Sequence, residues 1–113
     1  MCCSRIRVTL NGIVKDKQGQ YGIAGTYQKA IGLINNRSYW NHIDGNIALW
    51  WDITINVWLI GESIDLGSNT GYIHSAQDSA CPTTSDNQFK YNHSNDEDGF
   101  RFAPINSVSI QCV

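Results

Sequence analysis

The residues best suited to chemistry in this chain are its four cysteines. Cys2 and Cys3 are adjacent, and Cys81 and Cys112 lie far along the chain. No Cys-x-x-Cys spacing occurs, so the pattern predicts disulfides rather than a zinc site. Neighbouring residues on a strand point to opposite faces, so Cys2 and Cys3 suit two separate partners. The predicted pairing is Cys2–Cys81 with Cys3–Cys112, or the exchange of these partners.

Disulfides predict an extracellular, secreted protein. Two glycosylation sequons, at Asn36 and Asn92, point the same way. We therefore expect a mature chain whose signal peptide has been replaced by a start methionine. The alternatives are a cytosolic protein with free thiols, and a Met-Cys-Cys end that carries palmitate on the membrane surface.

The four tryptophans are the main candidates for binding. Trp50 and Trp51 are adjacent, so a strand would turn them to opposite faces. Alternation places Trp51 with Leu49 in the core and Trp50 beside Tyr39 on an open platform. Flat aromatic faces beside amides recognise sugars and proteins. The predicted binding surface consists of Tyr39, Trp40, Asn41 and Trp50. The alternative is that all four tryptophans pack in the core.

One loop has the beginnings of a calcium site. Oxygen-bearing side chains alternate at Ser94, Asp96 and Asp98, just before Gly99. The acid expected six residues past the glycine is absent, because Ile105 stands there. The pattern favours a solvated acidic turn over a calcium site at Asp96 and Asp98. We expect no metal and no cofactor.

Catalytic patterns are missing from the chain. His42 lies near Asp44, and His74 lies near Asp78, but neither pair has an evident nucleophile. No Gly-x-Ser-x-Gly and no phosphate-binding glycine pattern occurs. No two carboxylates share a strand face in the way that glycoside hydrolysis requires. We therefore expect a protein that is not an enzyme.

Short runs of β-branched and aromatic residues must position these side chains. Gly, Asn, Asp and Ser separate the runs every eight to twelve residues, which is typical of all-β proteins. Asn11-Gly12 and Asp44-Gly45 each predict a hairpin, and the second would place Trp40 opposite Leu49. Ile6, Val8 and Leu10 should share the core face of their strand. Further strands are expected near residues 23–27, 57–60, 72–74, 88–91 and 107–112.

Linking Cys112 to the amino-terminal cysteines would make the first and last strands neighbours. The resulting prediction is one domain over residues 1–113. Its fold is a small antiparallel β-sandwich or barrel of about seven to eight short strands, with disulfide-linked termini.

The order of several short motifs resembles small secreted β modules of animals. The motifs are Gly25-Thr26-Tyr27, Asn36-Arg37-Ser38-Tyr39-Trp40, Leu49-Trp50-Trp51, Trp58-Leu59-Ile60-Gly61 and Cys81-Pro82. This resemblance covers most of the chain. It implies mostly structural roles for these residues, and it carries over no catalytic residue.

Charge and composition narrow the partners. The 113 residues have a net charge of −2, which argues against nucleic acid, and no stretch approaches the roughly 20 apolar residues of a membrane span. We expect a secreted, non-catalytic recognition module that binds a glycan or an extracellular protein. The alternative is an extracellular matrix protein that self-assembles as a homo-oligomer, with its aromatics at subunit contacts. A third alternative is a small enzyme or inhibitor.

Overall fold

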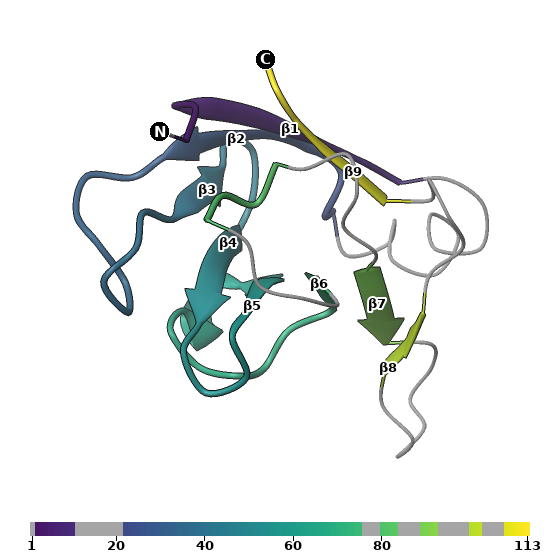
Figure 1. The fold of residues 1–113 in the computed structure, drawn as a ribbon. Helices are drawn as coiled ribbons and strands as arrows, with labels where there is room; N and C mark the ends of the chain where they lie inside the picture. Colours follow the sequence, from purple (N-terminus) through teal and green to yellow (C-terminus); the bar gives the residue numbers. More distant parts are fainter. Residues whose placement is uncertain (1, 11–21, 76–79, 84–88, 93–99, 103–107) are drawn as a thin grey trace.

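A computed structural model describes residues 2–10, 22–75, 80–83, 89–92, 100–102 and 108–113. The described residues form nine strands joined in one antiparallel sheet (Figure 1). The sheet curls from β1, β2 and β9 through β3–β6 to β7 and β8, like an open half-barrel. Within the described part, no helix is long and apolar enough to cross a membrane.

The sheet has the strand order β8-β7-β6-β5-β4-β3-β2-β1-β9, so β8 and β9 lie at its two edges. The strands are β1 (Arg5–Leu10), β2 (Gly25–Lys29), β3 (Trp40–His42), β4 (Ile47–Asp52), β5 (Val57–Glu62), β6 (Ile73–Ser75), β7 (Phe89–Asn92), β8 (Phe100–Phe102) and β9 (Val108–Cys112). A short 3-10 helix, η2 (Ser63–Asp65), follows β5.

The all-β class and the disulfide-linked termini are confirmed. The described part has nine strands where about seven to eight were expected. They join one curled half-barrel sheet, which corresponds to the predicted barrel and not to the alternative sandwich. β1 pairs with β9, as predicted for the first and last strands. The hairpin at Asp44-Gly45 places Trp40 opposite Leu49, also as predicted. The hairpin predicted at Asn11-Gly12 lies outside the described residues.

The core fills the concave side of the sheet. Ile6, Val8 and Leu10 are buried along β1 because alternate side chains of a strand share one face. Trp40 and Trp58 meet edge to face, with ring centroids 5.9 Å apart. The guanidinium of Arg37 lies 3.9 Å from the ring centroid of Trp51. Such aromatic and cation–π contacts each stabilise a core by about 0.5–2 kcal/mol.

The two central strands are buried on both faces. Every residue of β4 is buried, and so is every residue of β5 except Glu62. Leu49, Trp51 and Ile60 face the main core. Ala48, Trp50 and Leu59 form a second, smaller cluster on the opposite face. A central strand covered on both sides explains the continuous apolar run of β5.

Both disulfides start from the adjacent amino-terminal cysteines. Cys2 pairs with Cys81 and Cys3 with Cys112, which is the first of the two predicted pairings. Their Cα atoms lie 5.6 and 5.9 Å apart, within the ordinary range for disulfides. The Cys3–Cys112 bond spans 109 residues, and closing a loop of that length stabilises a fold by about 4–5 kcal/mol in the chain-entropy account.

Replacing both Cys3 and Cys112 by serine removes the longer crosslink and leaves Cys2–Cys81 in place. We expect the free energy of unfolding to fall by about 2–5 kcal/mol, measured by guanidinium unfolding. The same unfolding curve run under reducing conditions should shift further, because the second bond is then lost as well. A wild-type protein with four titratable thiols would contradict this account.

Candidate functional site

Trp50 is buried, so the predicted open platform around it is wrong. Its side chain is 0% exposed and its indole Nε1 donates a hydrogen bond of 2.9 Å to the carbonyl oxygen of Ser68. Half-buried Tyr39 and Leu66 pack against the cluster that contains Trp50. The segment after β5 therefore covers the face that the sequence left open.

Two glycines allow this segment to lie directly on the sheet. A Cβ added to Gly61 of β5 would meet the Cα of Gly71 at 2.9 Å and the Cη2 of Trp50 at 3.1 Å. A Cβ added to Gly71 would meet the Cγ of Leu59 at 2.7 Å and the carbonyl oxygen of Ile60 at 2.8 Å. Close backbone approach of this kind is what glycine permits in a strand.

Of the other predicted binding residues, Trp40 is also buried. Trp40 is 0% exposed in the main core, and its Nε1 donates to the carbonyl oxygen of Cys3 at 3.1 Å. Trp40 therefore offers no surface to a ligand, contrary to the prediction. Asn41 is exposed on the opposite face of β3. Tyr39, Asn41 and Trp50 do share one face of the sheet, as predicted, because Tyr39 packs against the Trp50 cluster and Asn41 pairs with Ala48 of that cluster. They form no open platform, because Trp50 is covered and Trp40 faces the main core.

The predicted glycosylation and calcium sites lie partly outside the described residues. Asn36 is exposed in a tight turn in which Ile34 and Arg37 form a β-bridge. Asn92 ends β7, and Asp96 and Asp98 lie outside the described residues. Among the residues that are described, no three metal-ligating side chains gather.

A polar cleft opens at one end of the sheet. It has a volume of about 500 Å³ and lies where β3 ends, β4 begins and β5 ends. Ligand sites of small molecules usually have volumes of roughly 300–1,000 Å³. The polar and aromatic side chains that line it are those of His42, Asp44, Asn46, Glu62 and Tyr72.

Glu62 and Tyr72 are held together at one wall of this cleft. The phenol of Tyr72 donates a 2.7 Å hydrogen bond to Oε1 of Glu62. The amide of Tyr72 donates to the carbonyl oxygen of Ile60, which fixes the chain beside β5. Strand pairing sets Glu62 opposite Ile47, and so beside the turn that carries Asp44 and Asn46. The cleft therefore combines acceptor oxygens with a half-buried aromatic ring.

His42 lines the cleft, and both of its ring nitrogens make hydrogen bonds. Its Nδ1 accepts a 3.0 Å hydrogen bond from the amide of Asp44, so Nε2 carries the proton and donates to the carbonyl oxygen of Ala24 at 2.9 Å. The ring also meets Tyr27 edge to face at 4.9 Å. Both ring nitrogens are thus used in structural bonds.

Tyr27 lies behind His42 in the core. Its hydroxyl donates a 2.6 Å hydrogen bond to the carbonyl oxygen of Ile23. Burial raises the pKa of the Tyr27 hydroxyl well above its ordinary value, because desolvation disfavours the phenolate. Tyr27 therefore stays a neutral donor that supports the cleft from beneath.

The sequence contained part of the information for this cleft. His42 and Asp44 stood out only as an unconvincing catalytic pair, and Glu62 and Tyr72 were not identified. The feature of the sequence that could have identified Glu62 is the turn at residues 53–56. This turn sets the register of the hairpin of β4 and β5, and that register pairs Glu62 with Ile47.

Comparison of the chain with family models, with curated proteins and with solved structures finds no match. The fold and the geometry define the class of molecule: a disulfide-linked all-β domain built on one curled antiparallel sheet, with a polar cleft at one end.

Replacing Gly71 by alanine should push the covering segment away from β5. We expect the free energy of unfolding to fall by about 1–3 kcal/mol, because the new methyl group meets Leu59 and the backbone of Ile60. Acrylamide should also quench tryptophan fluorescence more strongly, since Trp50 loses its cover. Gly45→Ala is the control, because the nearest atom to its added Cβ is 3.9 Å away. Equal stability of the two variants would refute this explanation of why Trp50 is buried.

Proposed function

We propose that the protein is a secreted, non-catalytic recognition module that binds a neutral glycan in the end cleft. The observation that carries the proposal is the grouping of Asp44, Asn46 and Glu62 around the half-buried ring of Tyr72. The amino-terminal disulfides and the exposed sequon at Asn36 are compatible with an extracellular protein.

A sugar suits this cleft because of its hydrogen-bonding chemistry. Hydroxyl groups donate well to carboxylates, and hydrogen bonds to charged groups contribute about 1.5–3 kcal/mol each. The ring of Tyr72 provides apolar surface for the carbon-bound hydrogens of a pyranose. The carboxylates of Asp44 and Glu62 would repel an acidic ligand, so a neutral sugar fits better than an anionic one.

The first test is a glycan array with the full chain, followed by calorimetric titration of the neutral oligosaccharide that binds best. We expect Glu62→Gln and Asp44→Asn each to weaken binding about tenfold or more, through loss of a charge-assisted hydrogen bond. Both side chains are exposed, so the free energy of unfolding should stay within about 0.5 kcal/mol of wild type.

Asp65→Asn is the matched control, since Asp65 belongs to η2 and does not line the cleft. It removes the same charge and should leave binding unchanged. An array without a neutral binder, or equal weakening by all three variants, would reject the glycan proposal. Binding of a Lys-rich protein that depends on Asp44 and Glu62 would identify a protein ligand instead.

A second candidate function is self-assembly through β9. Among the described strands, β9 pairs only with β1, and its residues Val108–Cys112 include no charge and no proline. Edge strands of monomers usually carry lysine, proline or a bulge that prevents pairing with another copy. The absence of such protective residues from β9 itself favours the matrix alternative.

If β9 joins copies of the chain, sedimentation velocity should show larger species as the protein concentration rises. Ser109→Lys places a charge on the edge strand and should return the protein to a monomer. Thr26→Lys is the control, because Thr26 lies on β2, which is paired on both sides. A monomer at all concentrations would reject self-assembly.

A further inference from the structure

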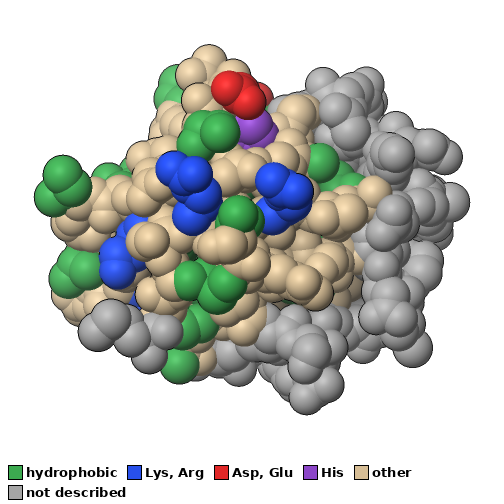
Figure 2. Space-filling view, turned by 90° about the horizontal axis from the view of Figure 1, so that it is seen from above, with side chains coloured by type: hydrophobic (Ala, Val, Ile, Leu, Met, Phe, Trp, Pro, Cys, Tyr) green, Lys and Arg blue, Asp and Glu red, His purple; other side chains and the backbone are tan. Residues whose placement is uncertain are grey.

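Two arginines project from the convex face of the sheet, and no carboxylate of the described strands shares that face with them. The alternate positions of β9, β1, β2 and β3 point outward there and are all polar. They are Ser109, Gln111, Arg5, Arg7, Thr9, Thr26, Gln28 and Asn41. None of these outward positions is a carboxylate. Figure 2 shows Lys and Arg side chains standing apart on the surface seen from above, and among the described residues the acidic and histidine side chains lie toward its edge.

Arg7 is the centre of this face. The strand register places Gln111 of β9 on one side of it and Thr26 of β2 on the other. Side chains directly opposite across two strands have Cβ atoms about 4.5–5.5 Å apart. No hydrogen bond or ion pair joins the guanidinium of Arg7 to the described residues. Within that part of the chain, no partner occupies its five N–H donors.

A second guanidinium lies close to the first. Arg5 and Arg7 are two positions apart on the same strand face, so their Cα atoms are about 7 Å apart. Arg5 is held in place because its Nε donates to Oε1 of Gln28 at 3.3 Å. Two like charges on one strand face repel each other, and an anion bound by both would relieve the repulsion. The net charge of the whole chain is −2, so this local excess of positive charge opposes the overall balance.

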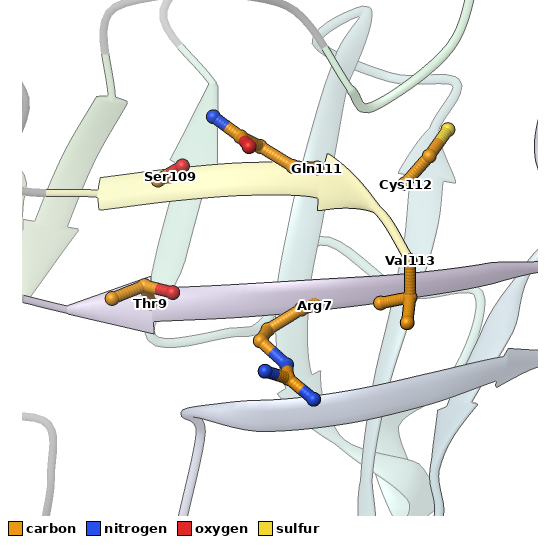
Figure 3. Close-up of a pocket in the computed structure, with 6 residues that line it drawn as sticks. All are labelled: Arg7, Thr9, Ser109, Gln111, Cys112 and Val113. Atoms are coloured by element: carbon orange, nitrogen blue, oxygen red, sulfur yellow. The ribbon is translucent and has the colours of Figure 1, made fainter.

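Hydroxyl and amide groups border the same surface. A shallow groove of about 250 Å³ is lined by Arg7 and Thr9 of β1 and by Ser109 and Gln111 of β9. Figure 3 shows Arg7 extending away from β9 toward the next strand, while Ser109 and Gln111 project from β9 itself. The groove between them is open to solvent on one side. It can follow an extended chain but does not enclose a single ion.

We propose that this face binds sulfate ester groups along an extended acidic polysaccharide. Planar guanidinium groups match tetrahedral oxyanions through paired N–H bonds, and the neighbouring hydroxyls and amide donate to the remaining oxygens. The open groove and the charge complementarity select a polyanionic chain over a small ion. The site is separate from the end cleft and does not depend on the function proposed for it.

The test is calorimetric titration with a heparin-derived hexasaccharide, its desulfated counterpart and inorganic sulfate. The hexasaccharide should bind at least about tenfold tighter than inorganic sulfate, because it engages both guanidinium groups at once. Binding should weaken as salt rises, since exposed charges are screened. Equal binding of the desulfated sugar, or of inorganic sulfate, would overturn the proposal.

Arg7→Gln should weaken binding of the hexasaccharide about three- to tenfold, and Arg5→Gln should act in the same direction. Lys29→Gln is the matched control, because it removes one positive charge from the alternate set of β2 that contains buried Tyr27. It should leave binding within about twofold of wild type. Equal loss in Arg7→Gln and Lys29→Gln would mean that only net charge matters and would overturn the assignment of this face.

Discussion

Two adjacent cysteines hold together a sheet that its own hydrogen bonds leave open. In the described structure β8 and β9 are the two edges of the sheet. Cys3 is joined to the end of β9, and Cys2 is joined to Cys81, between β6 and β7. The amino terminus therefore crosslinks parts of the sheet that are far apart in strand order. Trp40 extends this connection into the core, since its indole donates to the carbonyl of Cys3.

The covering of β4 and β5 determines which surfaces remain for binding. Both faces of these strands are buried, one by the main core and the other by the segment after β5. The close contact between Gly61 and Gly71 permits that cover. The aromatic residues are consequently used for packing: all four tryptophans are buried. The surfaces left for binding a ligand consist mainly of polar groups, at the end of the sheet and on its convex face.

Local patterns in the sequence were enough to predict strand faces and one register. Alternation identified the core side of β1, and Asp44-Gly45 fixed the opposition of Trp40 and Leu49, because turn length sets register. Alternation also separated Trp50 from Trp51 correctly. Alternation did not reveal that the segment after β5 covers Trp50. That cover depends on the contact between Gly61 and Gly71, and no periodic pattern in the sequence indicates it.

Shorter elements and the cleft were harder to predict for related reasons. β5 continues through Gly61 to Glu62, although glycine usually weakens a strand, because the missing side chain is what the close approach requires. β8 is only three residues long, too short for a period of two to stand out. The cleft unites residues from three strands and their connections, so it depends on the assembled sheet.

The low charge of the chain gives its few ionised groups unusual influence. Only 16% of residues are charged, so a carboxylate or guanidinium on the surface has few opposite neighbours to neutralise it. The described part keeps Asp44 and Glu62 in the end cleft, whereas Arg5 and Arg7 project from the convex face. Among the described residues, the end cleft therefore presents carboxylates and the convex face presents guanidinium groups. The sheet separates the two sets, because strand alternation sends Arg5 and Arg7 outward, while a turn and a strand end carry Asp44 and Glu62 to one rim.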